Sequence, residues 1–165
     1  MKRVLIIGDQ RSRRRFDGEE CDFYTEADAP GPFDYIVLDH VLQQADRGSV
    51  PKIIDFYKER LVGGGQLVLI LPSLEWACKE IAKTDEPNPL AYIALYGTDA
   101  EPHKSGMTMF WMRIVAEELG LVVIKAGGEW YKASLRIGDL EQEFQAQQNV
   151  LVAIRMPEDA ADALS

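Results

Sequence analysis

The sequence predicts an α/β fold, with an open, twisted and mostly parallel sheet of about six strands, helices on both faces and an antiparallel last strand. The apolar segments 33–40 and 66–71 are short and nearly continuous, as expected of strands buried on both faces of a parallel sheet. Residues 49–61 lie between them and have apolar positions at helical spacing, so the three segments form one β-α-β unit. A third apolar run, 3–7, ends at Gly8 and adds another strand.

The two helices in the middle of the chain have recognisable ends. Ser49 is a favourable N-cap, and Pro51 falls in the first helical turn, where its missing N–H costs nothing. The glycines at 63–65 end this helix before the strand at 66–71. The sequence then predicts a helix over 74–83, which the Pro-rich segment 84–89 ends.

The C-terminal part predicts one more helix and two strands. Thr108 is expected to cap a helix that ends at Gly120, with its inward face formed by Phe110, Trp111, Ile114, Val115 and Leu119. Strands are predicted at 121–125 and 149–155. We expect residues 1–155 to form a single domain and residues 156–165 to be a short, acidic, peripheral tail.

Composition excludes several classes of protein. The chain has 165 residues, 47% of them apolar, which is enough to bury the core of one domain. A net charge of −9 makes nucleic-acid binding unlikely, since that binding rests on neutralising phosphates. We find no stretch of 18 apolar residues and no cleavable leader, so we predict no membrane contact and a cytoplasmic location. Cys21 and Cys78 form no metal-binding or disulfide motif.

The order of residues in the central segments is typical of one protein family. Asp34 begins a strand that ends in Asp39-His40, and after the helix comes the run Gly63-Gly64-Gly65-Gln66. This order resembles the second half of a class I S-adenosylmethionine-dependent methyltransferase, a family with a Rossmann-like fold. Upstream, residues 27–34 are similar to the family's acidic adenine-binding motif. Downstream, residues 102–108 resemble the His-Lys-x-Gly-x-Thr element of a short subfamily, and the resemblance spans about residues 3–126.

The N-terminal segment departs from that family. Residues 4–12 stand where the family has a strand and a G-x-G-x-G turn, and only Gly8 matches, since Gln10 and Ser12 occupy the other two glycine positions. The interval from Gly8 to Phe33 is also too short for the usual elements, because one βαβ unit needs about 30 residues or more. We therefore expect an N-terminal truncation by about one β/α unit, with the remainder collapsed into 21–26.

The resemblance implies a set of cofactor-binding residues. Gly8 would allow close approach of S-adenosylmethionine, Asp28 would accept from the adenine amine, and Ala29 would offer its backbone N–H. Asp9 and Asp39 would lie near the cofactor, since carboxylates suit a cationic sulfonium, and Glu26 is the candidate ribose ligand. Asp28 is equally an ordinary turn residue before Pro30-Gly31, and Asp39 with His40 could simply cap the segment that follows.

In open α/β sheets ligands bind at the carboxyl ends of the strands, so we expect Gly8-Asp9, Asp28-Ala29 and Asp39-His40 to converge on one rim of the sheet. The resemblance also implies catalytic and substrate-binding candidates. His40 or His103 would accept the proton of the methyl acceptor, and Tyr96 and Lys104 would contact the substrate. The alternative for His103 and Lys104 is a solvated loop. Arg13 and Arg14 belong to the basic cluster 11–15, where they would bind an anionic substrate; the alternative is a loop of scattered ion pairs.

Two classes of function follow. One is a small methyltransferase that acts on an oxygen or nitrogen nucleophile of a small molecule or sugar. The other is a catalytically degenerate module of the same fold with a structural, assembly or regulatory role. In either case the lost unit leaves the first strand or the 21–26 strand as an open sheet edge, which predicts a homo-oligomer, most simply a homodimer through that side.

Overall fold

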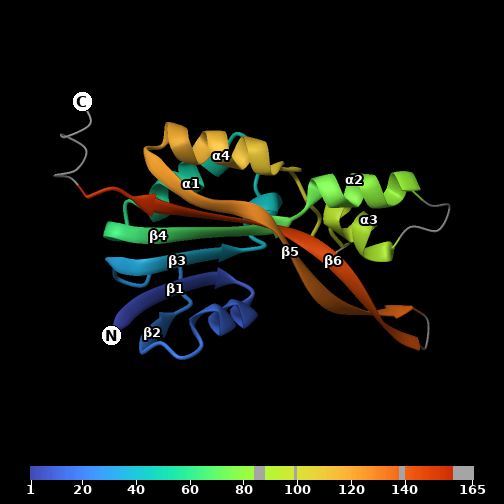
Figure 1. Cartoon of the computed structure of the whole chain (residues 1–165), viewed down its shortest axis with the longest axis horizontal. Coiled ribbons are helices and arrows are strands. Elements are labelled where there is room, and N and C mark those ends of the chain that lie inside the picture. Colours follow the sequence, from blue (N-terminus) through green and yellow to red (C-terminus); the bar gives the residue numbers. More distant parts are fainter. Residues whose placement is uncertain (84–87, 99, 138–139, 158–165) are drawn as a thin grey trace.

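The computed structural model describes residues 1–83, 88–98, 100–137 and 140–157, and its six strands form one sheet (Figure 1). Across the sheet the order is β2-β1-β3-β4-β6-β5. The strands span β1 Lys2–Gly8, β2 Cys21–Tyr24, β3 Phe33–Asp39, β4 Leu61–Pro72, β5 Leu121–Ile137 and β6 Leu140–Arg155.

The pairing confirms the predicted fold class. β2, β1, β3 and β4 are parallel to one another, whereas β6 runs antiparallel to both β4 and β5. The chain moves outward from β1 to β2 and then returns to β3 on the other side of β1. This reversal makes the carboxyl ends of β1 and β3 the switch point, where ligands bind in open α/β sheets. Within the described residues, β2 is the outermost strand on that side.

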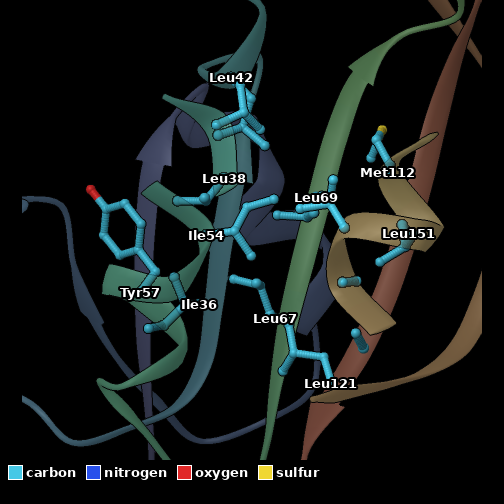
Figure 2. Packing of buried hydrophobic residues seen from close by; sticks show 14 of the residues in the cluster. Ile36, Leu38, Leu42, Ile54, Tyr57, Leu67, Leu69, Met112, Leu121 and Leu151 are labelled. Atoms are coloured by element: carbon cyan, nitrogen blue, oxygen red, sulfur yellow. The ribbon is translucent and has the colours of Figure 1, made fainter. Parts of the chain in front are cut away.

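Two helices cover one face of the sheet. α1 (Val50–Lys58) and α4 (Met109–Glu118) pack on the larger core (Figures 1 and 2). Side chains of β3, β4 and β6 meet these helices there, and Figure 2 shows Ile54 of α1 and Met112 of α4 on either side of Leu69. The alternation of strand residues between the two faces places Leu67 and Leu69 in this core and their neighbours on the other side.

A short 3-10 helix covers part of the other face. The segment η1 (Gln10–Phe16) follows β1 and buries Phe16 in a second core with Val4, Ile6, Val37, Val68, Ile70 and Val150. Phe16 packs edge-on against Phe23 of β2 and Tyr35 of β3, with ring centroids 6.0 and 5.1 Å away. This one aromatic anchor fixes η1 above the sheet.

The distal halves of β5 and β6 form a long hairpin arm that extends past the end of β4 (Figure 1). Helices α2 (Leu74–Lys83) and α3 (Pro89–Tyr96) lie beside it and form a third apolar cluster with it, which includes Trp76, Leu90 and Ala146. This arm and helix pair build a wall beyond the carboxyl ends of the strands.

Several details differ from the sequence prediction. β5 and β6 are far longer than the expected 121–125 and 149–155, because their distal halves pair with each other rather than with the parallel sheet. Helix α3 was not expected after the Pro-rich segment. The predicted inward face of α4 is only partly correct. Val115 is buried, and Trp111 and Leu119 pack against the core, but Phe110 is 74% exposed, and Met112 and Ala116 are buried as well.

Residues 158–165 of the predicted tail lie outside the described part of the chain. No helix among the described residues has the length and apolar character to cross a membrane.

Candidate functional site

An open cleft of about 1330 Å³ lies at the switch point. Its floor is formed by the ends of β1 and β3 with Gly8, Asp39 and His40, and η1 forms one side. The opposite wall comes from α3 and the hairpin arm, with Leu90 and Ile93 on the helix and residues 129–133 on the arm. The cleft is large enough for a cofactor-sized ligand together with a small substrate, because ligand pockets usually hold about 300–1,000 Å³.

Gly8 brings the ends of β1 and β3 together. Its φ is +100°, and a Cβ there would lie 1.8 Å from the Asp39 carbonyl oxygen. A larger residue would therefore have to push β1 and β3 apart. The next residue, Asp9, caps η1 by accepting from the Arg11 backbone N–H at 2.9 Å.

Asp39 is the most buried ionisable group of the cleft floor, with 6% of the residue exposed. One carboxylate oxygen accepts a hydrogen bond from the Ser12 hydroxyl, and the other lies 2.5 Å from Nδ1 of His40. Ser12 is itself buried within η1. The carboxylate thus links η1, the end of β3 and the imidazole ring.

His40 has a left-handed backbone, with φ +55°, while its N–H still donates to the Ile70 carbonyl at 2.9 Å. Such a conformation costs a residue with a Cβ about 1–3 kcal/mol, and residues of this kind concentrate at functional sites. The His40 ring packs edge-on near Tyr131 of the hairpin arm, with centroids 6.3 Å apart. Burial raises the pKa of Tyr131.

The basic cluster divides between the cleft and other positions. Arg11, Arg14 and Arg15 line the cleft. Arg11 pairs with Asp9, and this pairing lowers the pKa of the Asp9 carboxyl. Arg15 pairs with Glu129 of β5 at 2.8 Å. Arg13, by contrast, stacks over the Phe23 ring at 5.1 Å and is not part of the cleft lining, so the structure separates it from the predicted site.

Arg14 differs from Arg11 and Arg15, the other arginines that line the cleft, because it has no carboxylate partner among the described residues. Lys132 also lines the cleft, but it pairs with Glu143 at 2.7 Å. Arg14 is therefore the cleft cation most available to a ligand.

The predicted adenine and ribose ligands lie elsewhere. Asp28 and Ala29 precede the amino end of β3, where Arg60, just before β4, donates to the Ala27 and Ala29 carbonyls. Glu26 is an exposed residue of the same connection. None of the three lines the cleft, so the expectation that they converge with Gly8 and Asp39 is wrong. The segment 25–32 approaches the start of β3, and the carboxyl-end rule does not apply there.

His103, Lys104 and Tyr96 are also outside the cleft lining. His103 is half-buried, its Nδ1 lies 3.2 Å from the Ala94 carbonyl, and burial lowers its pKa. It borders a separate, water-sized cavity next to the buried Gln43. The Lys104 backbone N–H donates to the Gln43 carbonyl, and Tyr96 is exposed at the end of α3. These contacts give His103 and Lys104 a role in holding the loop after α3.

Sequence reasoning missed the wall of the cleft formed by Glu129, Trp130, Tyr131 and Lys132. Its signal was the Gly138-Asp139 pair, since two such residues between strand-like segments predict a hairpin. Helix α3 was marked by Asn88-Pro89, an N-cap followed by proline at the first helical position. The Asn88 side chain indeed accepts from the Leu90 N–H at 3.0 Å.

Sequence comparison identifies no relative, since no protein-family model and no curated protein matches the chain. Solved structures do match. A SAM-dependent methyltransferase from Methanosarcina mazei aligns over 95% of this chain and 93% of its own, at 13% identity and a TM-score of 0.53. A SAM-dependent methyltransferase from Archaeoglobus fulgidus aligns over 93% and 86%, at 13% identity and a TM-score of 0.54.

The chain has a class I methyltransferase-like fold. An O-methyltransferase family 2 protein from Planctomyces limnophilus, solved in complex with apigenin, shares this fold with a TM-score of 0.59 and 11% identity. The match covers 94% of this chain and 51% of that protein. At these identities the similarity establishes the fold alone, because one fold can support many kinds of chemistry.

Proposed function

We propose that the protein is a small S-adenosylmethionine-dependent methyltransferase that acts on an oxygen or nitrogen nucleophile of a small, anionic molecule. The observation that supports this most strongly is the cleft at the switch point, with Asp39 and His40 on its floor. In a sheet of this topology that is the ligand-binding position, and the fold is one whose solved members include methyltransferases.

The residues of the cleft suit this cofactor in charge and in size. Asp9 and Asp39 provide carboxylates at the ends of β1 and β3, which favour a cationic sulfonium and an ammonium group. Leu90, Ile93 and Trp130 offer apolar surface for a flat ring. Gln10 and Ser12 replace two glycines of the family turn, so we expect affinity in the high micromolar range or weaker.

The bound cofactor would supply an electrophilic methyl group, and the protein would supply alignment and proton removal. Holding the acceptor in line with that group accounts for most of the expected rate gain. His40 would take the acceptor's proton. Arg14, free of carboxylate partners among the described residues, would bind an anionic part of the acceptor.

Calorimetric titration with S-adenosylmethionine and S-adenosylhomocysteine tests the proposal. We expect both to bind weakly and Asp39→Ala to weaken binding further, because the carboxylate lines the cleft. Asp28→Ala is the matched control and should bind as the wild type does. Absence of binding at millimolar ligand would overturn the proposal, and submicromolar binding would show that the family turn has been placed on the wrong residues.

A second candidate is a non-catalytic module with a structural or regulatory role. It is favoured by Asp9 and η1, which stand where the family has its glycine turn. The side chains of Asp9, Ser12 and Arg15 already pair with other side chains of this chain. This candidate predicts that neither cofactor nor product binds, so the same titration separates the two functions.

A further inference from the structure

The cleft floor contains a continuous chain of polar contacts from Ser12 through Asp39 to His40. The Ser12 hydroxyl donates to Oδ2 of Asp39, and Oδ1 of the same carboxylate meets Nδ1 of His40. These three groups come from η1, from the last residue of β3 and from the residue after it. Elements well separated in sequence therefore meet at one carboxylate.

The chemistry of the pair fixes where the imidazole proton lies. An ionised carboxylate only accepts hydrogen bonds, so the nitrogen that faces Asp39 must carry a hydrogen. When the ring is neutral, Nδ1 is protonated and Nε2 keeps its lone pair. Among the described residues Nε2 has no hydrogen-bond partner, and the His40 side chain, which is 30% exposed, lines the cleft.

The surrounding backbone holds this arrangement in place. Gly8 allows β1 to approach the Asp39 carbonyl, Asp9 caps η1, and the cap sets Ser12 directly over the end of β3. His40 adopts φ +55° while its backbone N–H donates to the Ile70 carbonyl of β4. This hydrogen bond holds the His40 backbone against the sheet. The positive φ values of Gly8 and His40 thus both help to hold the contact between Asp39 and the His40 ring.

We propose that Ser12 and Asp39 are positioning residues that hold His40 as a base with Nε2 unprotonated and directed into the cleft. Ser12 then has a task of its own at a position where the resembling family has glycine, and Asp39 acts on the imidazole rather than on the cofactor alone. In the proposed function, on which the catalytic use of this base rests, the acceptor's proton would pass to Nε2 as its O–H or N–H bond breaks. The acceptor's electron pair would form the new bond to the methyl carbon, while the carbon–sulfur bond of the cofactor would break and leave its electron pair on the sulfur of S-adenosylhomocysteine. Asp39 offsets the positive charge that develops on the ring.

The test is the tautomer of His40, measured by nitrogen-15 NMR of the imidazole rings at alkaline pH. The chain has two histidines, so His103 serves as an internal control in the same spectrum. We expect wild-type His40 to show a protonated Nδ1 and an unprotonated Nε2. In Asp39→Asn the side-chain amide can donate to Nδ1, so this tautomer should be lost while the His103 signals stay unchanged.

Ser12→Gly restores the family residue and tests the far end of the chain of contacts. Loss of the hydroxyl frees the carboxylate to rotate, so the population of the Nδ1-protonated tautomer of His40 should fall. A wild-type His40 protonated mainly on Nε2 would overturn the proposal, as would an unchanged tautomer in Asp39→Asn with native His103 signals. An unchanged tautomer in Ser12→Gly would show that Ser12 is not a positioning residue for His40.

These outcomes are independent of the cofactor titration. If the tautomer is as expected but no cofactor binds, the methyltransferase proposal fails and the oriented base stands. If the cofactor binds but neutral His40 carries its proton on Nε2, the methyltransferase proposal stands and the oriented base fails. The unchanged His103 signals show in each variant that the fold is intact.

Discussion

Single residues at the switch point decide how closely the strands approach one another, and Gly8 is the clearest case. Gly8→Ala should destabilise the protein through two effects. The left-handed φ costs a residue with a Cβ roughly 1–2 kcal/mol, and the contact with the Asp39 carbonyl oxygen adds overpacking of about 1–3 kcal/mol. Urea denaturation would measure the sum.

Gly18 provides the matched control. Its φ is +88°, but no atom lies within 4 Å of the position that a Cβ would take, so Gly18→Ala should show the backbone cost without the clash. Equal losses for the two variants would contradict the close approach of β1 and β3.

Arg14 and Arg13 are neighbours in sequence with different surroundings, and this predicts different effects on ligand binding. Arg14→Ala should weaken binding of an anionic probe such as a sugar phosphate, and the wild-type affinity should fall as salt rises. Arg13→Ala should leave binding unchanged, because Arg13 stacks over Phe23 away from the cleft. Arg14→Ala should change the free energy of unfolding by less than about 0.5 kcal/mol, because the residue is exposed. Arg13→Ala should in addition lose the stacking on Phe23. If both variants bind the probe as tightly as the wild type does, the proposal that the substrate is anionic and contacts Arg14 is wrong.

At the scale of elements, the ion pair between Arg15 and Glu129 joins η1 to the hairpin arm across the cleft. Arg15, and with it Lys125, lowers the pKa of Glu129 below the ordinary 4.5. A lowered pKa contributes stability that is full above pH 4.5 and disappears as the pH falls through the folded-state value. Glu129→Gln should therefore be less stable than the wild type at neutral pH, by about 1 kcal/mol or less.

Thermal melting across the acid range tests this link. The difference between wild type and Glu129→Gln should shrink as the pH falls below 4.5 and vanish at lower pH. Glu143→Gln is the control, because its partner Lys132 lies on the same hairpin and the pair is exposed, so little stability should be lost. A difference that persists unchanged into acid would show that Glu129 stabilises the arm without its charge.

At the scale of the whole molecule, the open question is how the two sheet edges are covered. β1 is paired on both sides, so of the two strands proposed from sequence only β2 remains an edge. We predict a homodimer through the β2 side, where the strand's unpaired backbone groups are available. Light scattering at high micromolar concentration should give twice the 18.6 kDa mass of the chain.

The opposite edge offers the control variant. β5 exposes Val122 and Ile124, at 45% and 53%, so it is the competing interface. Ile124→Lys should leave a β2-mediated dimer intact. Loss of the dimer in that variant would move the interface to β5, and a monomer in the wild type would contradict dimerisation altogether.

The sequence alone determined the central architecture. The strands at 3–7, 33–40 and 66–71 and the helices near 49–61, 74–83 and 108–120 are all present, because segments buried in a core must have apolar residues at the period of their own structure. It also placed Gly8, Asp9, Asp39 and His40 on one rim, since parallel strands end on the same side.

Tertiary structure decided the rest. Among the described side chains of the hairpin arm, at 126–133 and 141–148, only Ala146 is buried, so the arm lacks the continuous apolar pattern that marks a buried strand. Asp28 lies away from the cleft because its connection leads to the amino end of β3, and only the path of that segment shows this. The contacts of Ser12 with Asp39 and of Arg15 with Glu129 join residues distant in sequence, and local patterns do not specify which distant side chains meet.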